Sequence, residues 1–419
     1  MKVSTITSGI PRAKRVWDSL EVSRWADRNR YYDATCLILK TILILGISPV
    51  RITAKGGAEY SLWSKRTGCC ILLLILFIYY VSAMFLQSAA TLARMSNNFV
   101  TFTHNLVPLM ALSPALVSPF ATWIEKKGVV NYINAWIHLQ ERYERITHSR
   151  LDRIFEGSRR FCRIGTLLSV LTPLLTGLWA IQASLLKIYK ETLHFLPVTY
   201  GVMQNYLLFT FWLINVRIMS KLIREYGKNF EQQIVRNPKV TIRMIEEYRQ
   251  LWLDISLQTN QLSSVFIEKI GPHIIIQTAT AIMSVYVWIF YSVDVVNFRL
   301  DTLSLHIFYE VTTLFLVFSY CNSGYVIGKI CEERVISKLL SIHSSSRHKS
   351  SKTKFQIVLF SFSAKCFPPN INMSGCCGIN RETLMTVFSA SVTHIVILIQ
   401  FRLATEDSLH LFKNNVEQS

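Results

Sequence analysis

Long apolar segments alternate with polar ones along nearly the whole chain of 419 residues. A helix needs about 20 apolar residues to cross a hydrocarbon core roughly 30 Å thick, because each residue rises about 1.5 Å. By this rule the sequence predicts seven membrane-spanning helices, at residues 69–93, 99–123, 164–186, 195–216, 270–293, 302–328 and 383–401. We therefore expect an all-α integral membrane protein.

A further apolar segment, residues 36–50, is too short for a span and carries Lys40. Basic residues flank it on both sides, among them Arg30 and Arg51. Short apolar helices with basic flanks bind the surface of a membrane. We interpret this segment as a helix that lies along the inner membrane surface.

The connections between the predicted spans differ in length and charge. Residues 125–160, 221–262 and 329–381 form long connections rich in Lys and Arg, whereas the intervening connections are short and carry little charge. Positively charged loops stay in the cytoplasm, so this pattern predicts a cytoplasmic amino terminus and an extracellular carboxyl terminus. The net charge of +19 is then a signal of membrane orientation. We expect membrane lipid, and no nucleic acid, as a partner.

Helical periodicity continues inside two of the basic connections. Apolar residues recur every four positions after the fourth span, at Leu222, Tyr226, Phe230 and Ile234. A second stripe precedes the fifth span, at Met244, Tyr248, Leu251 and Ile255. Stripes with this spacing mark one face of a helix, so both spans are expected to extend into the cytoplasm. There they would pack within one chain or between copies.

Motifs for other functional classes are missing or misplaced. The sequence has no P-loop, His-Glu-x-x-His or Gly-x-Ser-x-Gly motif, so we expect no enzyme, cofactor or metal. A G-protein-coupled receptor is the rival class, because "ERY" occurs at residues 141–143. That motif falls in the middle of a predicted loop, and the seventh span has no Asn-Pro-x-x-Tyr. The predicted cytoplasmic amino terminus also argues against this class.

Polar and aromatic side chains gather in the outer halves of five predicted spans. They are His104 and Asn105, Trp179 and Gln182, Tyr200 and Gln204, Trp288 and Tyr291, and, in the sixth span, His306, Tyr309 and Glu310. The last three share a helix face, and Glu310 lies about 12 Å from the outer end of its span. An unpaired carboxylate is costly at that depth, so we predict a ligand pocket open to the outside. The alternative is a set of structural hydrogen bonds, with Glu310 paired to His306.

The end of the sequence, "SGCCGINRETLMTVFSASVTHIVILIQF", resembles the carboxyl-terminal signature of insect gustatory receptors. The residues that match this signature in register are Gly375, Ile379, Asn380, Arg381, Thr393, Gln400 and Phe401. "LGISPV" at residues 45–50 is similar to a second stretch of the family. Cys376, Cys377 and His394 replace aromatic residues of the pattern. Ile395 stands where the sugar receptors of the family have glutamate, which argues against the sugar branch.

The resemblance implies a ligand-gated cation channel in which the seventh helices of four identical subunits line one pore. Heteromers with other gustatory receptors are an alternative. Thr393, Ile397 and Gln400 or Phe401 lie on one helix face, beside His394. A ring of Ile397 side chains can gate such a pore by dewetting, with the Gln400 amides facing water. The plainer reading of Gln400 is a hydrogen bond to a neighbouring helix.

Under this reading the chain divides into five regions. They are a cytoplasmic region with the surface helix (1–68), a six-helix ligand-binding region (69–328) with cytoplasmic extensions (219–262), an anchor with a disordered basic loop (329–381), the pore helix (382–402) and an extracellular tail (403–419). The resemblance further implies the plasma membrane of gustatory neuron dendrites and a small-molecule tastant. A bitter plant compound is our first expectation and a fructose-like monosaccharide our second. An olfactory relative is a further alternative.

Overall fold

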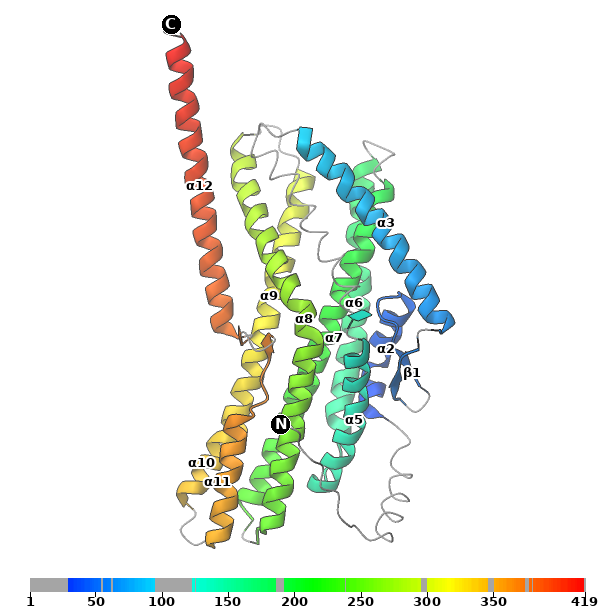
Figure 1. The fold of residues 1–419 in the computed structure, drawn as a ribbon, viewed down its shortest axis with the longest axis vertical. Helices are drawn as coiled ribbons and strands as arrows, with labels where there is room; N and C mark the ends of the chain where they lie inside the picture. The colour runs from blue at the N-terminus through cyan, green and yellow to red at the C-terminus, as the bar shows by residue number, and fades with distance from the viewer. Residues whose placement is uncertain are drawn as a thin grey trace, which may run out of the picture.

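The computed structural model describes residues 29–53, 56–61, 63–94, 123–124, 126–185, 192–237, 239–294, 300–345, 350–373, 377–378 and 380–417. Most of them form a bundle of long helices with one helix set apart (Figure 1). The α-helices are α2 (Arg30–Ile44), α3 (Lys65–Arg94), α5 (Lys126–Thr147), α6 (Asp152–Leu185), α7 (Thr192–Phe230), α8 (Ile242–Asp294), α9 (Leu300–Cys331), α10 (Ser337–Ser345), α11 (Ser351–Cys366) and α12 (Arg381–Glu417).

Short irregular elements connect the long helices. The π-helical turns η1 (Glu231–Val235) and η2 (Glu332–Ile336) follow α7 and α9. Two antiparallel hairpins complete the described elements. Strand β1 (Arg51–Ile52) pairs with β2 (Ala58–Glu59), and β3 (Asn372–Met373) pairs with β4 (Cys377–Gly378). The expectation of an essentially all-α fold is therefore confirmed for the described residues.

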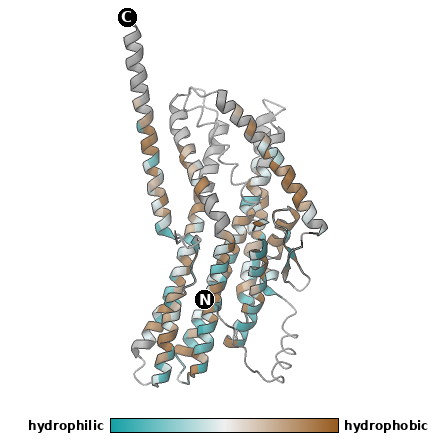
Figure 2. Cartoon of the chain, viewed as in Figure 1, coloured by the Kyte–Doolittle hydropathy of each residue, from teal (hydrophilic) through white to brown (hydrophobic). Residues whose placement is uncertain are grey.

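The predicted spans coincide with α3, α6, α7, α8, α9 and α12, and the second span, residues 99–123, lies almost entirely outside the described residues. Among the described residues, 4 helices are long and apolar enough to cross a membrane: Asp152–Leu178, Thr199–Val235, Leu314–Ser341 and Arg381–Phe401. A shorter apolar helix spans Thr67–Ala83. Figure 2 shows brown, hydrophobic positions along α3 and α12.

Helix α7 forms the centre of the bundle and packs against α6, α9, α2 and α3. Its Asn215 side chain is fully buried and accepts hydrogen bonds from the hydroxyls of Tyr31 (2.7 Å) and Tyr132 (2.9 Å). The Asn215 amide donates in turn to the Phe211 carbonyl at 2.7 Å. A buried polar group is stable only when it is paired, so this cluster fixes α2 and α5 against α7.

The predicted cytoplasmic stripes meet inside one chain. Leu222, Tyr226, Phe230 and Ile234 are buried at the lower end of α7 and in η1. Tyr248, Leu251 and Ile255 of α8 are also buried, and the Tyr226 hydroxyl donates to the Tyr248 carbonyl at 2.8 Å. The prediction that both spans continue as helices is thus confirmed. Their location in the cytoplasm stays a prediction.

The first basic connection is a helix, which the sequence reading missed. Helix α5 occupies residues 126–147, where a loop was expected, and its apolar face is buried. The "ERY" residues therefore lie in α5 and not in a loop. Tyr143 is buried, while Arg142 forms an ion pair of 2.6 Å with Asp254 of α8. The motif thus serves as a contact between two helices.

Helix α2 overlaps the helix predicted at residues 36–50, but it begins at Arg30 and ends at Ile44, and the bundle covers many of its apolar residues. Asn29 caps its first turn by accepting a hydrogen bond from the Tyr32 amide at 3.3 Å. Tyr31, Ile38 and Ile42 are buried, and the helix packs chiefly on α6. Much of its apolar surface therefore contacts the bundle, and its position along the membrane surface stays a prediction.

Helices occupy part of the expected disordered loop and most of the expected extracellular tail. The disordered loop was expected at residues 343–354, and its last four residues form the first turn of α11, because Ser350 accepts a hydrogen bond from the Thr353 amide at 3.3 Å. Helix α12 continues through most of the expected tail, to Glu417. Neither glycine nor proline occurs in residues 381–417, so nothing in the sequence ends the helix at residue 402.

Candidate pore helix and ligand pocket

Helix α12 stands apart from the bundle and contacts it near its own amino-terminal end (Figure 1). It packs chiefly against α8 and α9. None of the membrane-length segment Arg381–Phe401 is buried within the chain, although its mean hydropathy is 1.8. A soluble protein rarely exposes an apolar helix of this length, so both faces of α12 are available for lipid or another subunit.

The base of α12 is built by the residues that match the family signature. The Asn380 side chain caps the helix by accepting a hydrogen bond from the Thr383 amide at 2.9 Å. Arg381 donates to the side-chain oxygen of Asn322 in α9 through Nη2 (2.9 Å) and Nε (3.2 Å). Its guanidinium also lies 4.0 Å from the centre of the Tyr325 ring. These contacts fasten the start of α12 to α9.

The hairpin before α12 is fastened to α8. Ser263 donates a hydrogen bond to the Asn372 carbonyl at 2.6 Å, and the Asn372 amide donates back to the Ser263 hydroxyl at 3.0 Å. Thr383 of α12 donates to the Gly378 carbonyl of β4 at 2.6 Å. A displacement of α8 or α9 would therefore be transmitted to the base of α12.

The two faces of α12 differ in character. At offsets of three, four and seven, Thr386, Ala390, Thr393, Ile397 and Gln400 share a small and mostly polar face. Thr393, Ile397 and Gln400 are exposed in the single chain, as are His394 and Phe401 beside them. The opposite face carries bulky apolar residues, namely Met385, Phe388, Val392 and Ile399. Ile397 is the large apolar side chain on the small polar face.

A groove on this helix includes two of the predicted pore residues, Thr393 and His394. It is shallow and is lined by Met385, Thr386, Ser389, Ala390, Thr393 and His394. All of these residues belong to α12, so a closed pore would need further copies of the helix. The sequence correctly placed Thr393, His394, Ile397, Gln400 and Phe401 on one helix, and their role as pore or gate stays a prediction.

The predicted pocket residues lie at one end of the bundle. Trp179 and Gln182 are near the end of α6, and Tyr200 and Gln204 are near the start of α7. Trp288 and Tyr291 are near the end of α8, and His306, Tyr309 and Glu310 are near the start of α9. These helix ends lie together at the top of Figure 1. His104 and Asn105 lie outside the described residues.

Within this set, Tyr200 and Gln204 differ in their hydrogen bonding. The Tyr200 hydroxyl donates to the Leu45 carbonyl after α2, and its ring centre lies 5.3 Å from that of Phe77. Gln204 is 2% exposed, and its side-chain oxygen has no hydrogen-bond partner in the described part of the chain. Tyr200 therefore has a structural contact, whereas the Gln204 oxygen is an acceptor that a ligand could use.

The geometry combines helices of membrane length, an exposed helix with a small polar face, and a base that links this helix to α8 and α9. Comparison with known proteins agrees with it. The family model described as 7tm Chemosensory receptor matches residues 35–405. The chain is 20% identical to "Gustatory and odorant receptor 24" of Anopheles gambiae, over 90% of this chain and 80% of the relative. It is 21% identical to "Gustatory and odorant receptor 21a" of Drosophila melanogaster, over 95% and 86% of the two chains.

A solved structure has the same fold. The insect olfactory receptor OR5 from Machilis hrabei, in complex with eugenol, superposes with a TM-score of 0.60 at 12% identity. The superposition covers 91% of this chain and 99% of the receptor. The family match extends over most of the sequence, from α2 into α12. The chain therefore belongs to the insect 7tm chemosensory receptor family.

Proposed function

We propose that this chemosensory receptor is a ligand-gated, non-selective cation channel of the plasma membrane, opened by a tastant. The observation that carries the proposal is α12, a membrane-length helix with a small polar face, left exposed by its own chain and fastened to α8 and α9. Four copies of that face around an axis would enclose a pore whose narrowest apolar ring is Ile397.

The coupling between ligand and gate follows from the same two helices. Helices α8 and α9 carry Trp288, Tyr291, His306, Tyr309 and Glu310 at one end and hold the base of α12 near their middle. A ligand that binds more tightly when α8 and α9 are displaced shifts α12 toward the open arrangement. It can do so only to the extent of its preference for the open state.

The ligand that we propose is a bitter plant compound. The predicted pocket offers aromatic surface from Trp179, Trp288 and Tyr291 and polar groups at Gln182 and Glu310, which suits a partly apolar molecule with a few hydrogen-bonding groups. Ile395 in place of the glutamate of sugar receptors places a monosaccharide second.

A volatile compound is a second candidate for the ligand. Two curated relatives are named gustatory and odorant receptors, and the structural neighbour is an olfactory receptor in complex with eugenol. A pocket rich in aromatic residues suits such a compound as well. The two candidates share the channel mechanism and differ in the ligand alone.

Patch-clamp recording from non-neuronal cells that express this chain tests the channel. Cells are exposed to plant alkaloids, glucosides, simple sugars and volatile phenols while G-protein signalling is blocked. A rapid cation current that survives the block is expected, and the active compound names the ligand class. A response abolished by the block would support the G-protein-coupled alternative.

If the chain alone reaches the cell surface and gives no current, co-expression with other receptors of the family identifies the partner that it requires.

The pocket is tested separately from the pore. We expect Glu310→Gln to shift the agonist concentration for half-maximal current by about tenfold, because a charge-assisted contact contributes roughly 1.5 kcal/mol or more. Asp301→Gln, at the outer end of the same helix, serves as the control. Equal sensitivity of the two variants and the wild type would remove Glu310 from the pocket.

A further inference from the structure

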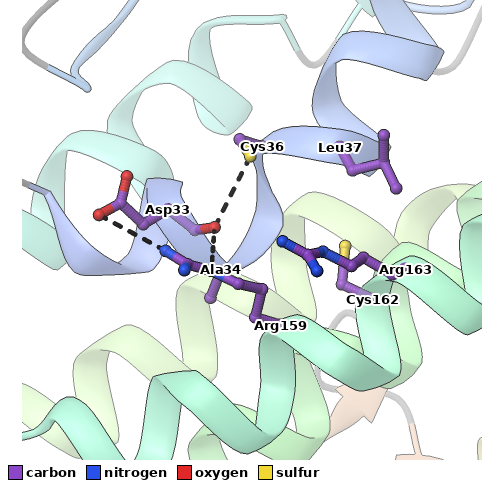
Figure 3. Close-up of a pocket in the computed structure, with 7 residues that line it drawn as sticks. All are labelled: Asp33, Ala34, Cys36, Leu37, Arg159, Cys162 and Arg163. Carbon is purple, nitrogen blue, oxygen red and sulfur yellow. Dashed lines mark hydrogen bonds and ion pairs between the residues drawn. The ribbon is translucent and has the colours of Figure 1, made fainter.

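We propose that a pocket between α2 and α6 binds the phosphate headgroup of an anionic phospholipid. Asp33, Cys36 and Leu37 of α2 form one wall, and Arg159, Cys162 and Arg163 of α6 form the other (Figure 3). The cavity measures about 120 Å³. It lies away from both α12 and the predicted ligand pocket. The proposal requires that α6 lies in a membrane and is independent of which ligand opens the channel.

The charges in this pocket favour an anion. Arg159 is held by Asp33, since its Nε donates to the Asp33 carbonyl at 3.3 Å and its Nη2 lies 3.8 Å from the Asp33 carboxylate. Arg163 has no ion pair within the described part of the chain. Its side chain extends from α6 toward the opposite wall in Figure 3. The lining thus contains two guanidinium groups and one carboxylate, and a guanidinium binds a phosphate through two parallel hydrogen bonds.

The surface next to the pocket fits acyl chains. Ile164 directly follows Arg163 and begins a row of exposed apolar residues along α6, namely Ile164, Leu167, Leu168, Leu171, Leu175 and Leu178. Their exposed fractions lie between 42% and 62%, and 28% of the apolar window of this helix is buried. A headgroup bound at Arg163 would therefore place its acyl chains along this row. A soluble phosphate could use the charges but not the row, so the occupant that we propose is a lipid.

The opposing explanation is that these arginines simply face the negatively charged membrane surface. Arg160 provides the matched control, because it is exposed, lies on the same turn of α6 and does not line the pocket. General attraction to an anionic membrane surface contributes about 1 kcal/mol per basic residue, or about fivefold in affinity, and should be the same for Arg160 and Arg163. A built phosphate site adds charge-assisted hydrogen bonds and raises the effect of Arg163 to about tenfold or more.

Alkylation of Cys36 reports on occupancy of the pocket. Cys36 lines the pocket and is half-buried, whereas Cys69 at the start of α3 is exposed and serves as the internal comparator. The full chain is placed in nanodiscs of phosphatidylcholine, or of phosphatidylcholine doped with increasing phosphatidylserine. The rate of modification of each cysteine by a maleimide is then followed by peptide mass spectrometry. Inorganic phosphate is added to the undoped nanodiscs in a parallel arm.

We expect phosphatidylserine to slow the modification of Cys36 relative to Cys69 in the wild type. The phosphatidylserine fraction that gives half-protection should rise about tenfold in Arg163→Gln and at most about fivefold in Arg160→Gln. Equal shifts in the two variants, or an unprotected Cys36 in the wild type, would overturn the proposal. Protection by inorganic phosphate alone would overturn the assignment to a lipid and leave a site for a soluble anion.

Discussion

At the scale of single residues, the small face of α12 explains why an apolar segment ends near a glutamine. Gln400 shares that face with Thr386, Ala390 and Thr393, and all of them would meet water in the proposed pore. Ile397 interrupts the series with a bulky apolar side chain that is 40% exposed in the single chain. In the proposed tetramer, four such side chains form the barrier that water and ions must cross.

We expect Ile397→Ala to give a constitutive cation leak without agonist, because a smaller side chain widens and wets the apolar ring. The matched control is Ile399→Ala, which removes the same side chain from the opposite face of the helix. Whole-cell current without ligand, normalised to surface protein, measures the effect. A closed channel with normal surface expression in Ile397→Ala would assign the gate to another position.

Arg381 joins α12 to α9 by two hydrogen bonds to Asn322 and by its contact with the Tyr325 ring. We expect Arg381→Gln to lower the maximal agonist-evoked current, because a looser base transmits less of the displacement of α9. A loss of about 1 kcal/mol of coupling corresponds to about fivefold in the opening equilibrium. Arg243→Gln, which removes an exposed pair with Glu247 in α8, should leave the current unchanged. If Arg381→Gln and Arg243→Gln give similar maximal currents, the contact of Arg381 with α9 does not contribute to gating.

At the scale of elements, apolar stripes that continue a long apolar segment were predicted from the sequence, and the stripe of α5, which stands by itself among charged residues, was not. The continuation of α7 was predicted because Leu222, Tyr226 and Phe230 repeat at helical spacing. The continuation of α8 was predicted from the similar repeat of Tyr248, Leu251 and Ile255. Helix α5 has a similar stripe, but the lysines, arginines and glutamates between its apolar positions made the segment resemble a charged loop. Counting the apolar residues that recur at helical spacing, whatever charged residues lie between them, would have predicted this helix.

The contacts of the candidate site are harder to predict because they join distant parts of the chain. Arg381 and its partner Asn322 are 59 residues apart, and Ser263 and Asn372 are 109 residues apart. Nothing in the local sequence around either residue indicates its partner. The sequence could therefore name Asn380 and Arg381 as matches to the family signature without showing that they build the base of α12.

The ion pair between Arg142 and Asp254 makes the contact of α5 with α8 sensitive to pH. Burial raises the pKa of the Asp254 carboxyl above its ordinary value, and Arg142 lowers it in part. The folded chain therefore holds this proton more tightly than the unfolded chain. The Asp254 carboxyl therefore stabilises the fold most when the pH is below its ordinary pKa of about 3.9. This stabilisation is lost as the pH rises through the raised pKa of the folded chain.

We expect Arg142→Gln to raise this pKa further and to lower the Tm at neutral pH. The loss is about 1 kcal/mol at most, or about 2 °C, because both partners are partly exposed. The difference from the wild type should shrink at acidic pH, as the carboxyl takes up its proton. Melting in detergent at neutral and acidic pH measures it. In the background of Asp254→Asn, position 254 cannot titrate. If Arg142→Gln still changes the Tm in a pH-dependent way in that background, another residue is responsible.

At the scale of the whole molecule, the lower helices have apolar surface that one chain does not cover. Helix α11 buries Ile357, Phe360 and Ala364 against its own chain. On another face, Phe355, Val358 and Phe362 are 66%, 44% and 64% exposed, at offsets of three and seven. Helix α11 lies at the lower end of the molecule in Figure 1. We expect this exposed stripe to contact a neighbouring subunit, because exposed apolar patches of this kind are typical of interaction sites.

If α11 packs against a neighbouring subunit, Phe362→Glu should dissociate the proposed tetramer, because it buries an unpaired carboxylate at the contact. Removal of a central aromatic contact costs about 2 kcal/mol or more per interface. Phe362→Leu, which keeps an apolar side chain, should assemble as the wild type does. Size-exclusion chromatography with light scattering measures the mass of the purified protein, and circular dichroism checks that each subunit keeps its helices. Because Phe362 is exposed in the single chain, the subunit should fold in both variants. A tetramer that persists in Phe362→Glu would place the contact between subunits elsewhere, with α12 as the next surface to test.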